Sequence, residues 1–420
     1  MPGINISRAE ALERSSHLTV ASYDVTIDVT NGEETFIAKT IVKFGCNKPG
    51  YDTFVDAVGK RIISATLNGN AVDVSNFDGE SVFLKNLAAS NELVLEIEAI
   101  YSKSGEGLQR SVDPVDNEVY LYSQGETAFI RHMFPCFDQP DLKGTFTLTA
   151  IAPSHWEVIS NNPEKSKSDL GNKKSKWEFE TTPLLPTYLY ALIAGPYAHI
   201  HDRYVGKKTI PLGIYCRKSL FEFLDAEDVF LITKQGFAYF ENVFGLAYPF
   251  AKYDQIAVVD FNWGAMENAG AVTFREDLLV FRSKVTERMY SARANTILHE
   301  MAHMWFGDLV TMKWWNGIWL NEAFATFMEM HATDAFRPQW DRWTTFGLSR
   351  TAAFDTDSLT STRPIEYPVI SPADAEGMFD ILTYEKGAAV VRMLEQYLGE
   401  DQFRSGIRQY LAEHAYGTTE

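Results

Sequence analysis

The first half of the chain alternates apolar and polar residues with the two-residue period of half-buried β-strands. The clearest alternating runs are 18–29, 36–44, 93–97 and 146–150. Turn-forming pairs such as Asn68-Gly69 and Gly171-Asn172 lie between the runs. Frequent turns between short strands are typical of antiparallel sandwiches. We therefore predict an antiparallel β-sandwich that ends at the Gly195-Pro196 pair.

The second half of the chain follows a different period. After one more strand-like stretch, 210–215, apolar residues recur every three or four positions, as they do along amphipathic helices. We predict helices over 219–243, 287–306, 318–336, 382–398 and 401–414. The change of period divides the chain into an N-terminal β-sandwich domain, residues 1–195, and a mostly helical α/β domain, residues 196–420. Two domains suit 420 residues, because single cores stop growing near about 250 to 300 residues.

Composition indicates a soluble globular protein and excludes several other classes. With 45% hydrophobic and 22% charged residues, the chain is neither disordered nor fibrous. No stretch approaches the roughly 18 consecutive apolar residues of a membrane helix, so we predict no membrane partner. The polar opening segment lacks the apolar run of a secretory signal, and we expect a cytoplasmic protein. Three widely spaced cysteines exclude a disulfide framework, and we expect them to be reduced and buried.

The charge balance argues against another class of partner. Acidic residues outnumber basic ones, 56 against 38, which gives a formal net charge of −18. Such a charge repels nucleic acid, so we predict no nucleic-acid partner. One basic cluster, 165–176, is interrupted by Asp169 and Gly171 and contains no aromatic residue. We interpret it as a solvated hairpin loop rather than an RNA site.

The strongest chemical signal is the run His299-Glu300-Met301-Ala302-His303, which has the H-E-x-x-H pattern. Residues four apart share a helix face, so both imidazoles can converge on one metal ion. Glu300 lies one step from His299, within reach of a water on that ion. The alternative is a pair of core histidines on a buried helix, which the pattern alone leaves open.

A hydrolytic zinc site needs a third protein ligand and an open fourth position. Glu322 lies nineteen residues after His303, far enough for a loop and a returning helix to bring its carboxylate beside the histidines. His299, His303 and Glu322 would then form a His₂Glu site suited to hydrolysis. Glu329, two turns further along the same helix face, is a candidate acceptor for the other ring N–H of a ligand histidine. A plain surface glutamate is the equal alternative at that position.

Four motifs occur together in this chain: HEMAHMWFGDLVTMKWWNGIWLNEAFATF, Gly264-Ala265-Met266-Glu267-Asn268, FPCFDQPDLKGTF and Tyr384-Glu385-Lys386-Gly387. In this combination the sequence resembles the M1 family of zinc aminopeptidases, which are gluzincin metalloproteases, from about residue 18 to its end. The H-E-x-x-H pattern followed by eighteen residues and then a glutamate is similar to the family's metal motif. The run from Gly264 is similar to its G-x-M-E-N exopeptidase motif.

The resemblance implies a saddle-like β-sandwich domain followed by a thermolysin-like catalytic domain. It also implies one zinc ion per chain, and peptides with free N-termini as substrates. Family members usually continue with a small β-sandwich and a large helical domain, which this sequence does not contain. They more often carry glycine where Ala323 follows the ligand glutamate, a difference from which we expect little effect.

An aminopeptidase must hold the free α-ammonium of its substrate at a fixed distance from the metal, and carboxylates serve this purpose. Two residues match the family's amine-binding glutamates: Glu267, and Glu126 from the β domain. Tyr384 matches the family's oxyanion donor, and Glu300 its general base. The candidate substrate-pocket residues are Gln124, Gly264, Ala265 and Met266.

Two other functions remain open at this stage. An epoxide hydrolase-like member of the family, with side aminopeptidase activity, carries the same metal motif. A catalytically inert truncated fragment or scaffold would keep the fold, although His299, Glu300, His303, Glu322 and Tyr384 are all present. The sequence does not indicate the preferred N-terminal residue, the physiological substrates or the oligomeric state.

Overall fold

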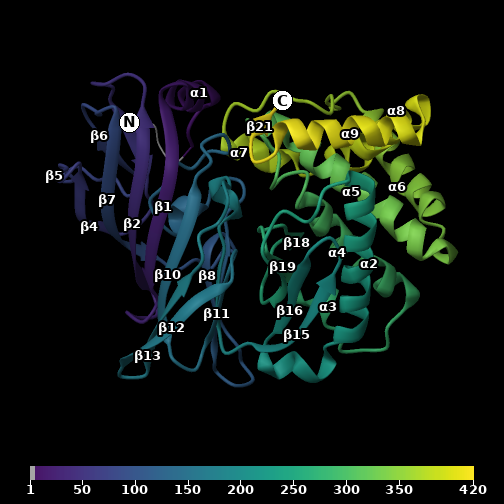
Figure 1. Cartoon of the computed structure of the whole chain (residues 1–420), viewed down its shortest axis with the longest axis horizontal. Helices are drawn as coiled ribbons and strands as arrows, with labels where there is room; N and C mark the ends of the chain where they lie inside the picture. The colour runs from purple at the N-terminus through teal and green to yellow at the C-terminus, as the bar shows by residue number, and fades with distance from the viewer. Residues whose placement is uncertain (1–4) are drawn as a thin grey trace.

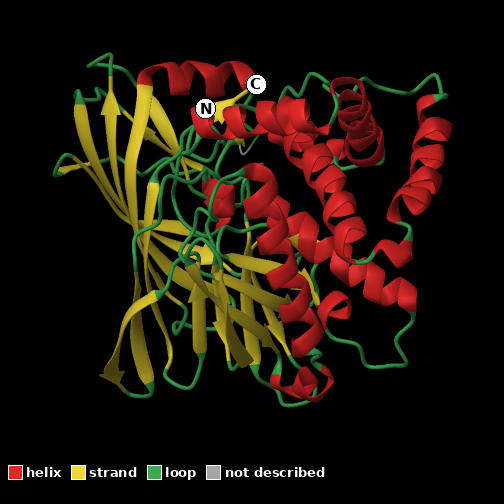
Figure 2. Ribbon diagram, turned by 45° about the vertical axis from the view of Figure 1, so that its right-hand side comes forward, coloured by secondary structure: helices red, strands yellow, loops and turns green. Residues whose placement is uncertain are grey.

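A computed structural model of the chain describes residues 5–420, and the start of the polar opening segment, residues 1–4, lies outside them. Figure 1 shows a β-rich part, built from the earlier half of the chain, beside a mainly helical part built from the later half. In Figure 2 the strands gather mostly on one side of the molecule and the helices on the other. This arrangement confirms the predicted fold class, a β-sandwich followed by a mostly helical α/β region.

The β-rich part is built on an eight-stranded sheet. In spatial order its strands are β12 (Glu164–Gly171), β13 (Lys174–Phe179), β10 (Thr145–Pro153), β1 (Leu18–Asp28), β2 (Thr35–Cys46), β7 (Ser90–Ile100), β4 (Arg61–Leu67) and β5 (Asn70–Ala71). Burial alternates along the central strands, as the two-residue period predicts. One pair departs from the predicted antiparallel arrangement, because β1 and β10 run parallel, with Tyr23 opposite Phe146. Many residues separate these two strands along the chain, so no hairpin fixes their relative direction.

A four-stranded sheet and a two-stranded pair complete the β-rich part. Their strands are β11 (Glu157–Ser160), β14 (Leu192–Gly195), β9 (Val119–Gln124) and β8 (Gly107–Val112), and the pair β3 (Thr53–Asp56) and β6 (Ser81–Leu84). In the core the rings of Phe146 and Tyr190 stack with centroids 4.1 Å apart. Strand β9 ends against the helical part, where Nε2 of Gln124 contacts Sδ of Met266 at 3.6 Å.

Two minor predictions about the β-rich part are confirmed. The basic cluster forms the β12–β13 hairpin, and β12 is largely exposed. Its turn places Gly171 at φ +75° and Asn172 at φ +52°, in the left-handed region that Gly and Asn tolerate best. The three cysteines, Cys46, Cys136 and Cys216, are free and buried.

A five-stranded sheet begins the second part of the chain. Its order is β15 (Ala198–Val205), β16 (Thr209–Cys216), β17 (Tyr253–Val258), β19 (Ala271–Arg275) and β18 (Ala265–Met266). Strand β14 ends at Gly195 in one sheet and β15 begins at Ala198 in another, and we propose the domain boundary between them. Strand β18 is an edge strand, so one side of its backbone has no strand partner.

The α-helices lie in the second part of the chain, except α1 (Arg8–His17), which precedes β1 and lies beside the β-rich part (Figure 1). The others are α2 (Ala226–Phe244), α3 (Glu276–Leu279), α4 (Glu287–His303), α5 (Ile318–Phe336), α6 (Arg342–Asp357), α7 (Pro372–Ala375), α8 (Gly387–Leu398) and α9 (Glu400–His414). Helices α2, α4 and α5 lie side by side next to the sheet (Figure 1). Strands β20 (Thr311–Met312) and β21 (Thr418–Thr419) pair in parallel, which the polar end of the sequence did not predict.

The structure corrects several predicted helix boundaries. Helix α2 begins at Ala226 because residues 218–223 form a separate 3₁₀ helix. Helix α4 ends at His303 because the chain turns at Gly307, whose φ is +129°. The helix predicted over 382–398 opens with a π-helical turn, Leu382–Lys386. Helices α1 and α6 were not predicted, because few of their residues are buried and they carry no continuous apolar stripe.

Tryptophans support the helices below the predicted metal site. Trp314 is buried, and its Nε1 donates to the carbonyl of Val369 at 2.8 Å. The ring of Trp315 lies 5.5 Å from that of Tyr188, and Trp319 packs partly buried against the core. All three tryptophans therefore serve the packing of the folded chain. Within residues 5–420, no helix combines the length and the apolar character needed to cross a bilayer.

Candidate active site

Helix α4 places both histidines of the H-E-x-x-H run on one face. Its first turn is capped by Thr286, whose hydroxyl accepts a hydrogen bond from the backbone N–H of Met289. At the other end of the helix, the rings of His299 and His303 lie one turn apart with centroids at 4.7 Å. Helix α5 packs against α4 and carries Glu322 to the same point.

Three predicted ligand atoms converge there. Nε2 of His299 lies 3.0 Å from Nε2 of His303 and 3.1 Å from Oε2 of Glu322. Nε2 of His303 lies 3.4 Å from the same carboxylate oxygen. His303 and Glu322 are almost fully buried, and His299 is slightly exposed. The two histidines and the glutamate are therefore close enough to share one cation.

The spacing of these atoms fits tetrahedral zinc. Ligand atoms about 2.0 to 2.1 Å from a tetrahedral zinc lie about 3.3 to 3.4 Å from one another. The observed separations of 3.0, 3.1 and 3.4 Å are close to that range. Two imidazole nitrogens and a carboxylate are also a donor set that zinc commonly takes in hydrolytic sites. The residues present thus fit the metal.

The remaining ring nitrogens have partners that fix the orientation of each imidazole. Nδ1 of His299 lies 2.9 Å from Oε2 of Glu329, which lies on α5 about two turns after Glu322. Nδ1 of His303 lies 3.0 Å from the backbone carbonyl of Phe306, in the turn that follows α4. In both histidines these contacts place the ring N–H on Nδ1 and leave Nε2 free to bind a metal.

The electrostatics of the site link these groups. Although burial lowers the pKa of His299, hydrogen bonds to Glu322 and Glu329 hold it well above its usual value. Burial also lowers the pKa of His303, but Glu267 and Glu322 raise it to about 9. Burial raises the pKa of Glu322, but the two histidines lower it to about 2. The carboxylates around the site thus favour the positively charged form of both histidines.

Glu300 has a different environment from the ligand carboxylate. It is 5% exposed, and burial raises its pKa to about 8 despite the opposing charges of His299 and His303. A carboxylate with a pKa near neutrality can both take and return a proton, as general acid–base catalysis requires. Its carboxylate also lies within 4.8 Å of ligand atoms on Glu267 and His303.

Two more glutamates reach the site from different sheets. Glu267 follows edge strand β18, and Glu126 follows β9 of the β-sandwich. The carboxylates of Glu126, Glu267 and Glu322 have oxygens that all lie within 4.8 Å of one another. Burial raises the pKa of Glu267, and burial together with the charge of Glu267 raises that of Glu126 well above the usual value. Oε1 of each of these two glutamates is buried and has no hydrogen-bond partner among residues 5–420.

Tyr384 completes the set of predicted chemical groups. It lies in the π-helical turn before α8, and its ring stacks on that of His299 with centroids 6.0 Å apart. Burial, reinforced by the charge of Glu322, raises the pKa of its hydroxyl well above the usual value. The hydroxyl therefore stays protonated and can act as a hydrogen-bond donor.

These residues surround a narrow cavity of about 50 Å³. The predicted residues that line it are Gln124, Glu126, Ala265, Met266, Glu267, His299, Glu300, His303, Glu322 and Tyr384. Two other predicted residues, Gly264 and Glu329, do not line the cavity. Glu329 contacts His299, which does line it. Two lining residues were not predicted, Trp263 and Phe379, whose rings lie 5.8 Å apart. Their positions, directly before Gly264 and five residues before Tyr384, are the only sequence signals that point to them.

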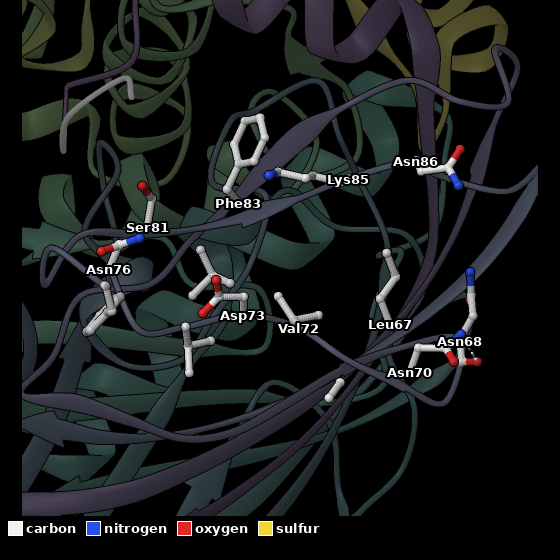
Figure 3. Close-up of a pocket in the computed structure, with 14 residues that line it drawn as sticks. Leu67, Asn68, Asn70, Val72, Asp73, Asn76, Ser81, Phe83, Lys85 and Asn86 are labelled. Carbon is white, nitrogen blue, oxygen red and sulfur yellow. Dashed lines mark hydrogen bonds between the residues drawn. The ribbon is translucent and has the colours of Figure 1, made fainter.

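A larger cavity lies elsewhere, at the edge of the β-sandwich. It measures about 760 Å³, and it is lined by residues from the end of β4 to just after β6, among them Asn68, Asp73, Phe83 and Lys85 (Figure 3). Its lining contains no histidine and no cysteine, and Asp73 is its one carboxylate. It therefore lacks the convergent ligands and acid–base groups that the smaller cavity has.

Comparison with known proteins agrees with this geometry. The model of the peptidase M1 N-terminal domain matches residues 19–189, and that of the peptidase family M1 domain matches residues 230–420. Aminopeptidase N of Streptomyces lividans is 47% identical to this chain over 428 residues, which cover 100% of the chain and 49% of that protein. The probable aminopeptidase 2 of Sulfurisphaera tokodaii is 38% identical, over 87% of the chain and 46% of that protein.

A further relative is the leucyl aminopeptidase of Saccharolobus solfataricus, 36% identical over 87% of the chain and 46% of its own length. The chain thus spans about half the length of the curated relatives it matches. The two family models match different regions of the chain, and residues from both regions line the candidate site. The chain belongs to peptidase family M1.

Proposed function

We propose that this chain is a zinc-dependent aminopeptidase, which removes single residues from the free N-termini of peptides. One observation carries the proposal. Glu126 and Glu267 present buried carboxylate oxygens, which have no hydrogen-bond partner within residues 5–420, directly beside the convergent atoms of His299, His303 and Glu322. A metal-dependent hydrolase that acts inside peptide chains has no need of two such carboxylates next to its ligands.

The three convergent donors would hold the zinc ion. When bound there, zinc would polarise the scissile carbonyl and lower the pKa of the attacking water. Glu300, which lines the same cavity, would accept the proton of that water. With its pKa near neutrality, it would then return the proton to the leaving amine.

The pair of carboxylates accounts for the choice of a chain end. Burial and the charge of Glu267 raise the pKa of Glu126, so an incoming α-ammonium would lower the electrostatic free energy of the pair while it forms hydrogen bonds. An internal peptide bond offers no such cation. Glu126 and Glu267 would therefore fix the substrate amine at a set distance from the three donor atoms.

Tyr384 and strand β18 would position the rest of the substrate. The protonated hydroxyl of Tyr384 would donate to the oxygen on which negative charge develops. The unpaired side of β18, at Ala265 and Met266, would accept the substrate backbone as an additional strand. Gln124 and Met266, in contact with each other, would border the pocket of the first side chain.

The test is hydrolysis of a panel of aminoacyl p-nitroanilides, each with a free and an N-acetylated amine, before and after chelation and return of zinc. We expect cleavage of the free-amine compounds alone, loss of cleavage with the chelator, and recovery with zinc. Cleavage of the acetylated compounds at a similar rate would contradict the role of the carboxylate pair. Activity that survives full removal of zinc would contradict the metal assignment.

A further inference from the structure

Helix α8 exposes an apolar stripe that a surface helix does not normally carry. Its exposed apolar residues are Val390, Met393, Leu394, Tyr397 and Leu398, with relative exposures of 43%, 69%, 48%, 87% and 45%. Their spacing of i, i+3, i+4, i+7 and i+8 places them on one side of the helix, within an arc of about 140° at 100° per residue. Gln396 is the one polar residue among the exposed positions of this helix.

The stripe does not lie on the side of α8 that packs against the rest of the chain. Val391 and Glu395 face the interior and are buried, and α8 packs on α5 through that side. Together with Val391, the stripe makes the apolar surface of α8 wider than the side that packs on α5, and the exposed part of that surface is free for a covering partner. The neighbouring helix α9 differs, because its exposed positions are polar or small, for example Gln402, Ser405 and Gln409.

The comparisons indicate what covers the stripe. The chain accounts for 49% of the length of Streptomyces lividans aminopeptidase N, so that protein has about as much polypeptide again beyond the matched part. A second copy of this chain is a weaker fit, because each copy carries a net charge of −18 and two copies repel each other. A stable contact also needs more than one helix face, roughly 1,000 Å² in total, which a further domain supplies.

We propose that the α8 stripe is the docking surface for the part of the M1 relatives that this chain does not span. The stripe begins six residues after Tyr384, on the helix that continues from its π-helical turn. A partner seated on α8 would therefore contact the helix that continues directly from the π-helical turn carrying Tyr384. The proposal concerns coverage of a surface and does not depend on the catalytic role of any residue.

The test uses an introduced thiol. Because the three native cysteines are buried, Tyr397→Cys gives the chain one exposed thiol on the stripe. Ser168→Cys, on the exposed strand β12, is the matched control far from α8. Each variant is made in this chain alone and in a chimera that adds the unmatched part of Streptomyces lividans aminopeptidase N, and the rate of reaction with Ellman's reagent is measured.

We expect the thiol at position 397 to react at least ten-fold more slowly in the chimera than in the chain alone, and the thiol at position 168 to react equally in both. Equal rates at position 397 would overturn the proposal. Protection that appears in the chain alone and grows with protein concentration would also overturn it, in favour of a second copy. If the chimera does not fold, the same measurement is made on full-length Streptomyces lividans aminopeptidase N with a cysteine at the position aligned with 397. A thiol there that reacts as fast as the one at position 397 of this chain alone would refute the proposal.

Discussion

A buried charge cluster lies within the β-rich part, and it offers a sharp test of how this fold is stabilised. Asp56 lies between two guanidinium groups, with Oδ2 at 2.9 Å from Nη1 of Arg14 and Oδ1 at 3.3 Å from Nη1 of Arg131. Asp138 forms the second carboxylate, with Oδ2 at 3.0 Å from Nε of Arg131. All four side chains are at most 2% exposed, and together they are electrically neutral.

The substitution Asp56→Asn removes one negative charge and replaces one acceptor oxygen by an amide NH2, which would face Nη1 of Arg131. The asparagine keeps the size of the side chain and an oxygen that can accept the 3.0 Å hydrogen bond from the N–H of Asp138. It leaves one buried positive charge uncompensated, and breaking a buried ion pair in this way costs about 3 to 5 kcal/mol. We therefore expect the free energy of unfolding to fall by that amount, with bound zinc unchanged because the ligands lie on α4 and α5.

The measurement is urea unfolding followed by circular dichroism, with linear extrapolation to water. The control is Glu92→Gln in the eight-stranded sheet. It removes the exposed ion-pair partner of Lys43, and we expect it to change the free energy of unfolding little. Adding Arg14→Met to Asp56→Asn restores neutrality, and the double variant should be more stable than the sum of the single effects by about 1 kcal/mol or more. A loss below about 1 kcal/mol for Asp56→Asn alone would refute the reasoning.

Three further predictions test the site and the pH response. Glu300→Gln should keep its zinc, measured by atomic absorption, but lose about 100-fold or more in kcat, and retention of a tenth of kcat would contradict its role as general base. Glu267→Ala should weaken inhibition by free-amine amino-acid amides far more than by their N-acetylated forms, and an equal effect on both would remove its role. Burial and the charge of Arg131 lower the pKa of His132 from 6.5 to about 4, so the unfolded chain takes up a proton below pH 6.5 that the folded chain resists. Stability contributed by His132 is therefore present above pH 6.5 and lost as the pH falls toward 4, by about 3 kcal/mol in all. His132→Phe should flatten this part of the stability curve, and an unchanged slope in urea unfolding between pH 7 and pH 4.5 would contradict the assignment.

Local patterns in the sequence predicted the parts of the molecule that local physics determines. The spacing of His299 and His303 follows from helix geometry alone, and a single loop and returning helix bring Glu322 to them. The two-residue period likewise predicted the strands, because each buries one face. The parallel direction of β1 and β10 was not predictable, since it depends on the packing of segments that lie far apart in the chain.

Helix α6 illustrates a second limit of prediction from sequence. Its buried residues are Arg342, Phe346 and Ala353, while Leu348 and Phe354 are exposed. Such a helix has no apolar stripe of regular period, so the usual signal is missing. Trp263 and Phe379 show the same limit at the site, because they come from two loops and meet only in the folded chain.

The amine-binding pair depends most strongly on the fold as a whole. Nothing in the spacing around Glu126 relates it to Glu267, and only the family resemblance indicated it. The two segments meet because the β-sandwich docks on the helical part, where Nδ2 of Asn161 donates to the carbonyls of Leu189 at 2.7 Å and Ala269 at 2.9 Å. The side chain of Asn161 thus binds both another segment of the β-rich part and the turn that follows Glu267. The proposed selection of a free amine would therefore be a property of the interface between the two parts, and we expect a change at Asn161 to affect it although Asn161 is not among the three proposed metal ligands.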